Sequence, residues 1–247
     1  MEKHEYKTMF SVEDNHWWYA GLRNLVLSFI DKLTHGKGNH KILDAGCGTG
    51  GLLAACKGRY IFGIDISEEA LKFCGTRELS NVSRGSVCDM PFQDNSFQVV
   101  ISLDVLYHVN VLDDLEALKE FNRVIAPKGI LLLNLPAYDF LKSSHDEVIH
   151  TRHRYTVREV KNKVESAGFT VERTTYRNTL LFPLALAARL ARKLHLQNEK
   201  KRGSDLSPLP DWLNSFLKGI LFLENRLILR GLNFPFGLSV FCVARKK

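Results

Sequence analysis

The run from Lys41 to Gly51, KILDAGCGTGG, constrains the fold more than any other stretch of this chain. An apolar strand ends in the acidic Asp44, and glycines then alternate with other residues before a helix-like segment at 52–57. Glycine permits a sharp strand-to-helix turn and lets a ligand lie against the main chain, where N–H groups at the helix start face it. We therefore predict a nucleotide-type cofactor loop.

The glycines alone do not identify the cofactor, because Gly46, Gly48 and Gly51 also fit the dinucleotide pattern G-x-G-x-x-G. Asp65 ends the next apolar segment, where a carboxylate suits two ribose hydroxyls. Apolar segments then alternate with helical patterns, which predicts a parallel, doubly wound sheet with ligands at the carboxyl ends of its strands. We expect these strands at 41–44, 60–65, 82–87, 97–103 and 130–135, followed by strands at 169–176 and 238–245.

Later segments decide between the cofactors. Cys88–Phe92, Asp94–Val100 and Ser102–His108 follow in an order and at a spacing that resemble class I S-adenosylmethionine (SAM)-dependent methyltransferases, specifically the type 11 group. The resemblance is strong over about residues 41–135. It implies SAM as the cofactor and an α/β, Rossmann-like doubly wound sheet, the class I methyltransferase fold, with a helical insertion before the last strand.

The resemblance also implies which residues hold SAM. Asp44 and the glycines would surround its methionine part, and Asp65 would hold the ribose. Asp89 and Met90 match the positions beside the adenine. The complete set of cofactor-binding residues that it implies is Asp44, Ala45, Gly46, Cys47, Gly48, Asp65, Ile66, Asp89, Met90 and Leu103.

With 247 residues and 45% hydrophobic content, the chain can form one substantial α/β domain with an elaboration. We expect a helical lead-in or cap at 1–39, a SAM-binding core at 40–177, an apolar and basic helical insertion at 178–237 and the last core strand at 238–247. The aromatic cluster Trp17–Tyr19 would either pack in the lead-in or help to close a lid over SAM.

Five scattered cysteines without a C-x-x-C pair indicate neither a disulfide scaffold nor a zinc site. The N-terminus lacks the apolar core of a signal peptide. We therefore expect a reduced, cytoplasmic protein that is peripheral on the inner membrane face if its insertion binds lipid.

The insertion has two interpretations. Helices are expected at 183–196 and 212–229, and their uninterrupted apolar runs are too short to span a membrane. They could pack as a lid, or residues 178–230 could contact an anionic membrane surface through Arg189, Arg192 and Lys193 and the basic linker that follows. Charge asymmetry favours an anionic partner, because residues 1–151 carry a net charge of −5 and residues 152–202 carry +9.

Tyr107, His108 and His145 are the candidate catalytic residues. Tyr107 and His108 follow the fourth strand, where the acceptor approaches in the family, and His145 lies in a polar loop after the fifth. His108 could act as a general base, since imidazole titrates near neutrality. Alternatively the histidines shape the pocket and alignment alone drives the transfer. Their spacing matches no metal motif, so no metal is expected.

These observations predict a SAM-dependent methyltransferase whose acceptor is small or amphipathic, with lipid-linked molecules and sugars as candidates. Two alternatives stay open. The glycine pattern by itself would suit an NAD-type oxidoreductase, and the basic insertion would suit a non-catalytic SAM-binding or membrane-associated scaffolding protein. A nucleic-acid partner is not expected, since the sequence has no recognisable RNA-binding module. The oligomeric state is not readable.

Overall fold

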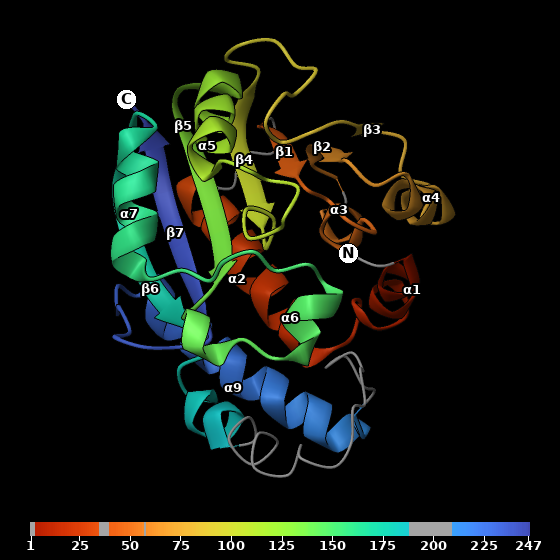
Figure 1. Cartoon of the computed structure of the whole chain (residues 1–247), viewed down its shortest axis with the longest axis vertical. Helices are drawn as coiled ribbons and strands as arrows, with labels where there is room; N and C mark the ends of the chain where they lie inside the picture. Colours follow the sequence, from red (N-terminus) through yellow and green to blue (C-terminus); the bar gives the residue numbers. More distant parts are fainter. Residues whose placement is uncertain (1–2, 35–39, 57, 188–208) are drawn as a thin grey trace.

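The computed structural model describes residues 3–34, 40–56, 58–187 and 209–247, without the side chains of Ser144 and His145. Its centre is a seven-stranded sheet in the order β3-β2-β1-β4-β5-β7-β6 (Figure 1). Neighbouring strands are parallel except that β7 runs antiparallel to both β5 and β6. The predicted doubly wound α/β sheet is confirmed. The strands are β1 (Lys41–Ala45), β2 (Tyr60–Asp65), β3 (Val82–Arg84), β4 (Phe97–Leu103), β5 (Ile125–Pro136), β6 (Phe169–Arg177) and β7 (Ser239–Lys246).

Several helices begin at side-chain caps. Ser67, Asp113 and Thr156 each accept a hydrogen bond from a backbone N–H of the first turn, which pairs a group that the helix itself cannot pair. The helices are α1 (Lys3–Val12), α2 (Trp17–Leu33), α3 (Gly51–Ala55), α4 (Glu68–Thr76), α5 (Asp114–Val124), α6 (Ser144–Val148), α7 (Val157–Ser166) and α9 (Asp211–Leu229).

Helices cover both faces of the sheet. Alternate residues of a strand point to opposite faces, so Leu43 packs in the cluster that contains α5 and α7, whereas Ile42 packs in the cluster that contains α2. Figure 1 shows α5 and α7 on the near side of the sheet and α2 behind it. Burial on both faces explains why the central strands are almost continuously apolar.

The connection between β6 and β7 contains α9, which lies along α2 and runs in the same direction. The N–H of Trp17 donates to Asn214 Oδ1 at 2.8 Å near one end, and Lys32 Nζ donates to the carbonyl of Leu229 at 2.7 Å near the other. Between them, Leu221 fills the space left by Gly21, where any Cβ would overlap it. A helix of the insertion therefore completes the layer formed by α2.

Only part of the first predicted insertion helix lies within the described residues. The chain is helical at 182–187, and the basic residues Arg189, Arg192 and Lys193 with the linker after them lie outside the described part. Within the described ranges, no helix is both long and apolar enough to cross a membrane.

We expect Leu221→Ala to lower the free energy of unfolding by roughly 2–5 kcal/mol, because it leaves a void between two packed helices. Leu221 is 1% exposed, whereas Leu112 is 84% exposed. The control Leu112→Ala should change stability by less than about 0.5 kcal/mol. Equilibrium unfolding in urea measures both, and equal losses in the two variants would contradict this packing.

Candidate functional site

A cavity of about 750 Å³ opens at the carboxyl ends of β1, β2 and β4. In Figure 1 these strand ends point toward α1 and α6. The cavity therefore lies where a doubly wound sheet places its ligands. Seven of the predicted cofactor-binding residues line it, namely Asp44, Gly46, Cys47, Gly48, Asp65, Ile66 and Leu103.

Asp65 ties the glycine loop to the start of the next helix. Its Oδ2 accepts a hydrogen bond from Gly48 N at 2.9 Å, and its Oδ1 accepts one from Ser67 N at 2.8 Å. Gly46 has a φ of 91° and packs so closely on Val105 that a Cβ would overlap that side chain. Since an ionised carboxylate accepts about four hydrogen bonds, Asp65 keeps acceptor capacity for ribose hydroxyls.

Three carboxyl groups, those of Asp44, Asp65 and Glu13, line the cofactor end of the cavity. Burial, followed by the nearby Asp65 and Glu13, raises the pKa of Asp44 to about 8. Burial also raises the pKa of Asp65 and of Glu13. A cation placed among these groups would favour their ionised forms. The sulfonium and ammonium groups of SAM are such cations, so the residues present fit this cofactor.

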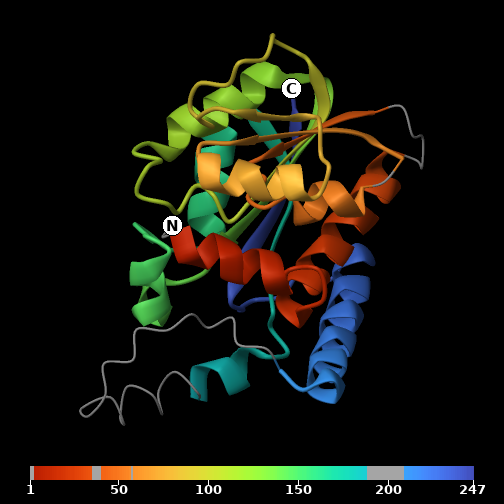
Figure 2. The ribbon, with the colours of Figure 1, turned by 90° about the vertical axis from the view of Figure 1, so that its right-hand side faces the viewer.

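The N-terminal segment covers the glycine loop. Glu13, just after α1, accepts hydrogen bonds from the Thr49 hydroxyl and from Arg77 Nη2, the latter at 2.8 Å. Tyr6 and Met9 of α1 line the cavity, and so does the aromatic cluster Trp17–Tyr19 at the start of α2. Figure 2 shows α1 crossing the front of the molecule. The lead-in thus forms a wall of the site as well as packing beside it.

Ala45, Asp89 and Met90 do not line the cavity in the described structure. Met90 is 3% exposed and packs in the core, while its N–H donates to Glu120 Oε1 at 2.8 Å. Strand β3 ends at residue 84, earlier than predicted, and the following residues 85–87 face the cavity instead. The contact of Asp89 and Met90 with adenine stays a prediction.

Tyr107 and His108 lie together at the other end of the cavity. Burial lowers the pKa of His108 to about 4, and its Nδ1 accepts a hydrogen bond from Asn110 N at 3.1 Å. Burial raises the pKa of Tyr107, so its hydroxyl is neutral at physiological pH. His145 lies in α6, and its side chain lies outside the described part of the chain.

Asp104 is a cavity residue that the sequence reasoning did not select. It follows β4 directly, and its φ of 56° is uncommon for a residue with a side chain. Its Oδ1 accepts a hydrogen bond from Asn134 Nδ2 at 2.9 Å, and burial raises its pKa to about 6. The available signal was its position, because Asp44, Asp65 and Asp104 all stand at or next to the carboxyl end of a buried parallel strand.

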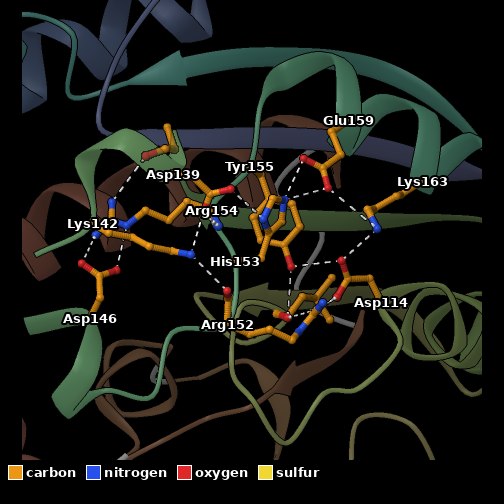
Figure 3. A network of polar contacts seen from close by, with 12 residues as sticks. Asp114, Asp139, Lys142, Asp146, Arg152, His153, Arg154, Tyr155, Glu159 and Lys163 are labelled. Carbon is orange, nitrogen blue, oxygen red and sulfur yellow. Dashed lines mark hydrogen bonds and ion pairs between the residues drawn. The ribbon is translucent and has the colours of Figure 1, made fainter.

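A polar network holds the loop that follows β5 (Figure 3). His153 lies between Asp139 and Glu159, with both nitrogen–oxygen distances at 2.9 Å. Arg154 donates to both carboxylate oxygens of Asp146 at 2.7 and 3.0 Å. These side chains position the loop, and of the five only Asp146 and Arg154 also line the cavity. Among the described residues, no group of histidine, cysteine and acidic side chains could hold a metal ion.

Comparison with known proteins identifies the family. The profile of a family described as a methyltransferase domain matches residues 43–133, which contain the glycine loop and the ends of β1, β2 and β4. A probable SAM-dependent methyltransferase of Mycolicibacterium smegmatis is 29% identical over 168 residues, covering 66% of this chain and 62% of that protein. Residues 43–133 thus form a methyltransferase domain like that of class I SAM-dependent methyltransferases, and the chain spans less than two thirds of the length of the curated relatives it matches. The methyltransferase fold and the resemblance drawn from the sequence are thereby confirmed.

Two further likenesses show how varied the relatives are. A 24-methylenesterol C-methyltransferase of Oryza sativa subsp. japonica is 30% identical over 139 residues, covering 49% of this chain and 32% of the rice protein. The crystal structure of a putative sarcosine dimethylglycine methyltransferase from Galdieria sulphuraria has a TM-score of 0.57 at 19% identity, covering 92% and 86% of the two chains. The latter shows the fold alone. Neither alternative from the sequence, an NAD-type oxidoreductase or a non-catalytic scaffold, receives support.

We expect SAM binding near pH 7 to release up to about one proton, because the cofactor's positive charge lowers the raised pKa of Asp44. Above about pH 9 the release should vanish, since Asp44 is then ionised before binding. Calorimetric titration in buffers of different ionisation enthalpy measures it. Asp44→Asn should abolish the release, and Asp94→Asn, at an exposed side chain, should leave it unchanged. Undiminished release in Asp44→Asn would assign the proton to another group.

Proposed function

We propose that this protein transfers the methyl group of SAM to a small or amphipathic acceptor. The observation that supports this most directly is one continuous cavity, which runs from the glycine loop to Tyr107 and His108. When bound, SAM supplies an electrophilic methyl group on a sulfonium. The chain's own residues bind the cofactor at one end, exclude water and align the acceptor at the other.

Alignment is the main catalytic contribution that we assign to the protein. Holding two reactants in line can supply on the order of 7–11 kcal/mol of a barrier. Trp17 and Trp18 line the cavity, as do Tyr6 and Met9 of α1. Such enclosure keeps water from the reacting groups and limits the positions that an acceptor can take.

Proton removal from the acceptor is assigned to His108 first and to Asp104 second. His108 is neutral at physiological pH, because burial lowers its pKa to about 4, and a neutral imidazole can accept a proton. Asp104 lies in the same cavity, and its pKa of about 6 is closer to the operating pH. His145 stays a third candidate on sequence grounds. Tyr107 is better suited to donate a hydrogen bond to the acceptor than to take its proton.

The acceptor class follows from the lining of this end of the cavity. Leu238 and Ala185, from the segments around the insertion, add apolar surface beside the polar Tyr107 and Ser239. A site with both characters suits an amphipathic molecule, such as a lipid-linked or sugar-bearing acceptor. The rice relative named for a sterol agrees with an apolar acceptor, and the structural neighbour named for sarcosine acts on a small one by its name.

Asp65→Ala should weaken SAM binding at least about tenfold, since a charged hydrogen bond is worth roughly 1.5–3 kcal/mol. Titration calorimetry with SAM, its demethylated product and NAD gives the affinities. Wild-type protein that binds NAD and ignores SAM would overturn the proposal, whereas Asp94→Asn should bind SAM like the wild type.

His108→Gln should lower turnover while SAM affinity stays nearly unchanged. Transfer from labelled SAM to the lipid, small-molecule and RNA fractions of a cell extract measures turnover and sorts the acceptors. Activity of the wild type should fall on acidification toward pH 4, where His108 gains a proton, and not near 6.5 as for an ordinary histidine. A fall centred near pH 6 that disappears in Asp104→Asn would move the base to Asp104. Unchanged turnover in both variants would leave alignment alone as the mechanism.

A further inference from the structure

The outer face of α9 is apolar and exposed. Trp212, Phe216 and Leu223 are 71%, 61% and 52% exposed, and Phe222 beside them is 36% exposed. They stand at helical spacing on the side of α9 opposite Leu217, Leu221 and Ile228, which are buried. We call Trp212, Phe216, Phe222 and Leu223 the outer α9 face. A helix that only had to cover α2 would carry polar residues there, and large apolar patches on soluble proteins mark contact sites.

The charges around this face are mostly positive, and the exposed Asp211 beside Trp212 is its acidic neighbour at the start of α9. Arg226 and Arg230 are exposed at its C-terminal end, and Lys218 lies between Phe216 and Phe222 in sequence. Glu224, the only acidic residue between 212 and 230, is 1% exposed and turns inward, where it accepts hydrogen bonds from the N–H groups of Asn178 and Leu180. From Trp212 to Arg230 the exposed charges are therefore positive, and Asp211 stands at the opposite end of the helix from Arg226 and Arg230.

A second apolar segment joins this face to the cavity. Leu180 and Leu184 are 45% and 66% exposed, and the N–H of Leu180 donates to Glu224 Oε2 at 3.0 Å, which holds the segment against α9. The next residue after Leu184, Ala185, lines the cavity. Figures 1 and 2 both place this short helical segment and the start of α9 at the same end of the molecule. The segment that contains Leu184 and Ala185 therefore belongs both to the exposed apolar surface and to the wall of the cavity.

We propose that the outer α9 face, with Leu180 and Leu184, docks on an anionic lipid bilayer. The aromatic and aliphatic side chains enter the interface, and Arg226 and Arg230 meet anionic headgroups, as in helices that lie in the plane of a membrane. We favour the bilayer over a second copy of this chain because the exposed arginines of this face outnumber its exposed acidic residues, which suits an anionic surface better than a copy of the same face. The net charge of +9 over residues 152–202 agrees with an anionic partner.

The docking explains how an amphipathic acceptor could reach the site, and in that respect it rests on the proposed methyl transfer. A lipid-linked acceptor would keep its apolar part in the bilayer while its polar end enters the cavity past Leu184 and Ala185. The surface interaction itself needs neither SAM nor an acceptor, so it can be measured separately.

Co-sedimentation of the full chain with vesicles tests the docking. Vesicles of equal parts phosphatidylglycerol and phosphatidylcholine should pellet the wild type at low salt, and pure phosphatidylcholine should retain little. Binding should weaken as salt is raised, because exposed charges are screened. Trp212→Ser/Phe216→Ser should lower the partition coefficient at least about tenfold, and Arg226→Gln/Arg230→Gln should remove most of the dependence on salt and anionic lipid. The control Tyr60→Ser, at an aromatic side chain that is 55% exposed elsewhere, should bind like the wild type.

Thermal melting and SAM titration show whether each variant is folded. Absence of the wild type from the anionic pellet, or equal binding by Trp212→Ser/Phe216→Ser, would overturn the docking. A dimer in light scattering that this variant loses would replace the bilayer by a second copy. Vesicle binding without methyl transfer would support the docking and contradict the proposed function. Methyl transfer without vesicle binding would support the proposed function and contradict the docking.

Discussion

The carboxyl groups of three aspartates lie together at one edge of the parallel sheet, and the rest of the site depends on how they are compensated. Asp44, Asp65 and Asp104 stand at the ends of three adjacent strands, in surroundings where burial raises the pKa of each. Desolvated carboxylates at close range cost stability unless hydrogen bonds or cations compensate them. Asp65 accepts hydrogen bonds from two backbone N–H groups and Asp104 accepts one from the amide of Asn134, and a cation bound beside Asp44 would favour its ionised form. A positively charged cofactor would therefore reduce the electrostatic cost of these buried carboxyl groups when it binds.

Closure of the site relies on segments from both ends of the chain. The lead-in supplies α1 and the aromatic start of α2, and the connection before β7 supplies α9, which hydrogen-bonds to α2 at several points. Because α2 also packs against the sheet, its contacts with α9 fix where the insertion lies relative to the sheet. Trp17, which lines the cavity, is therefore held from outside it by Asn214, a residue nearly two hundred positions away in the chain.

Prediction from the sequence worked best where one local pattern controls the outcome. Strand β2 was placed at its exact limits, because an apolar run between a basic loop and Asp65 leaves little freedom. The helix caps at Ser67, Asp113 and Thr156 depend on local sequence alone, because each side chain bonds to its own helix. The end of β3 could not be predicted in this way, since only pairing with β2 decides how far that short strand extends. Asp104 was also missed as a site residue, because its importance lies in facing Asn134 and the cavity rather than in a motif.

The sequence by itself determined the sheet, the cofactor loop and the methyltransferase family, because alternating apolar segments and closely spaced glycines are local requirements of that fold. Only the tertiary structure decided which residues meet in the cavity and which side of each insertion helix stays exposed. It made His153 part of a structural network, lowered the pKa of His108 by burial, and turned Glu224 inward so that α9 shows a basic and apolar face. Burial and charge pairing depend on neighbours distant in sequence, and no local pattern encodes them.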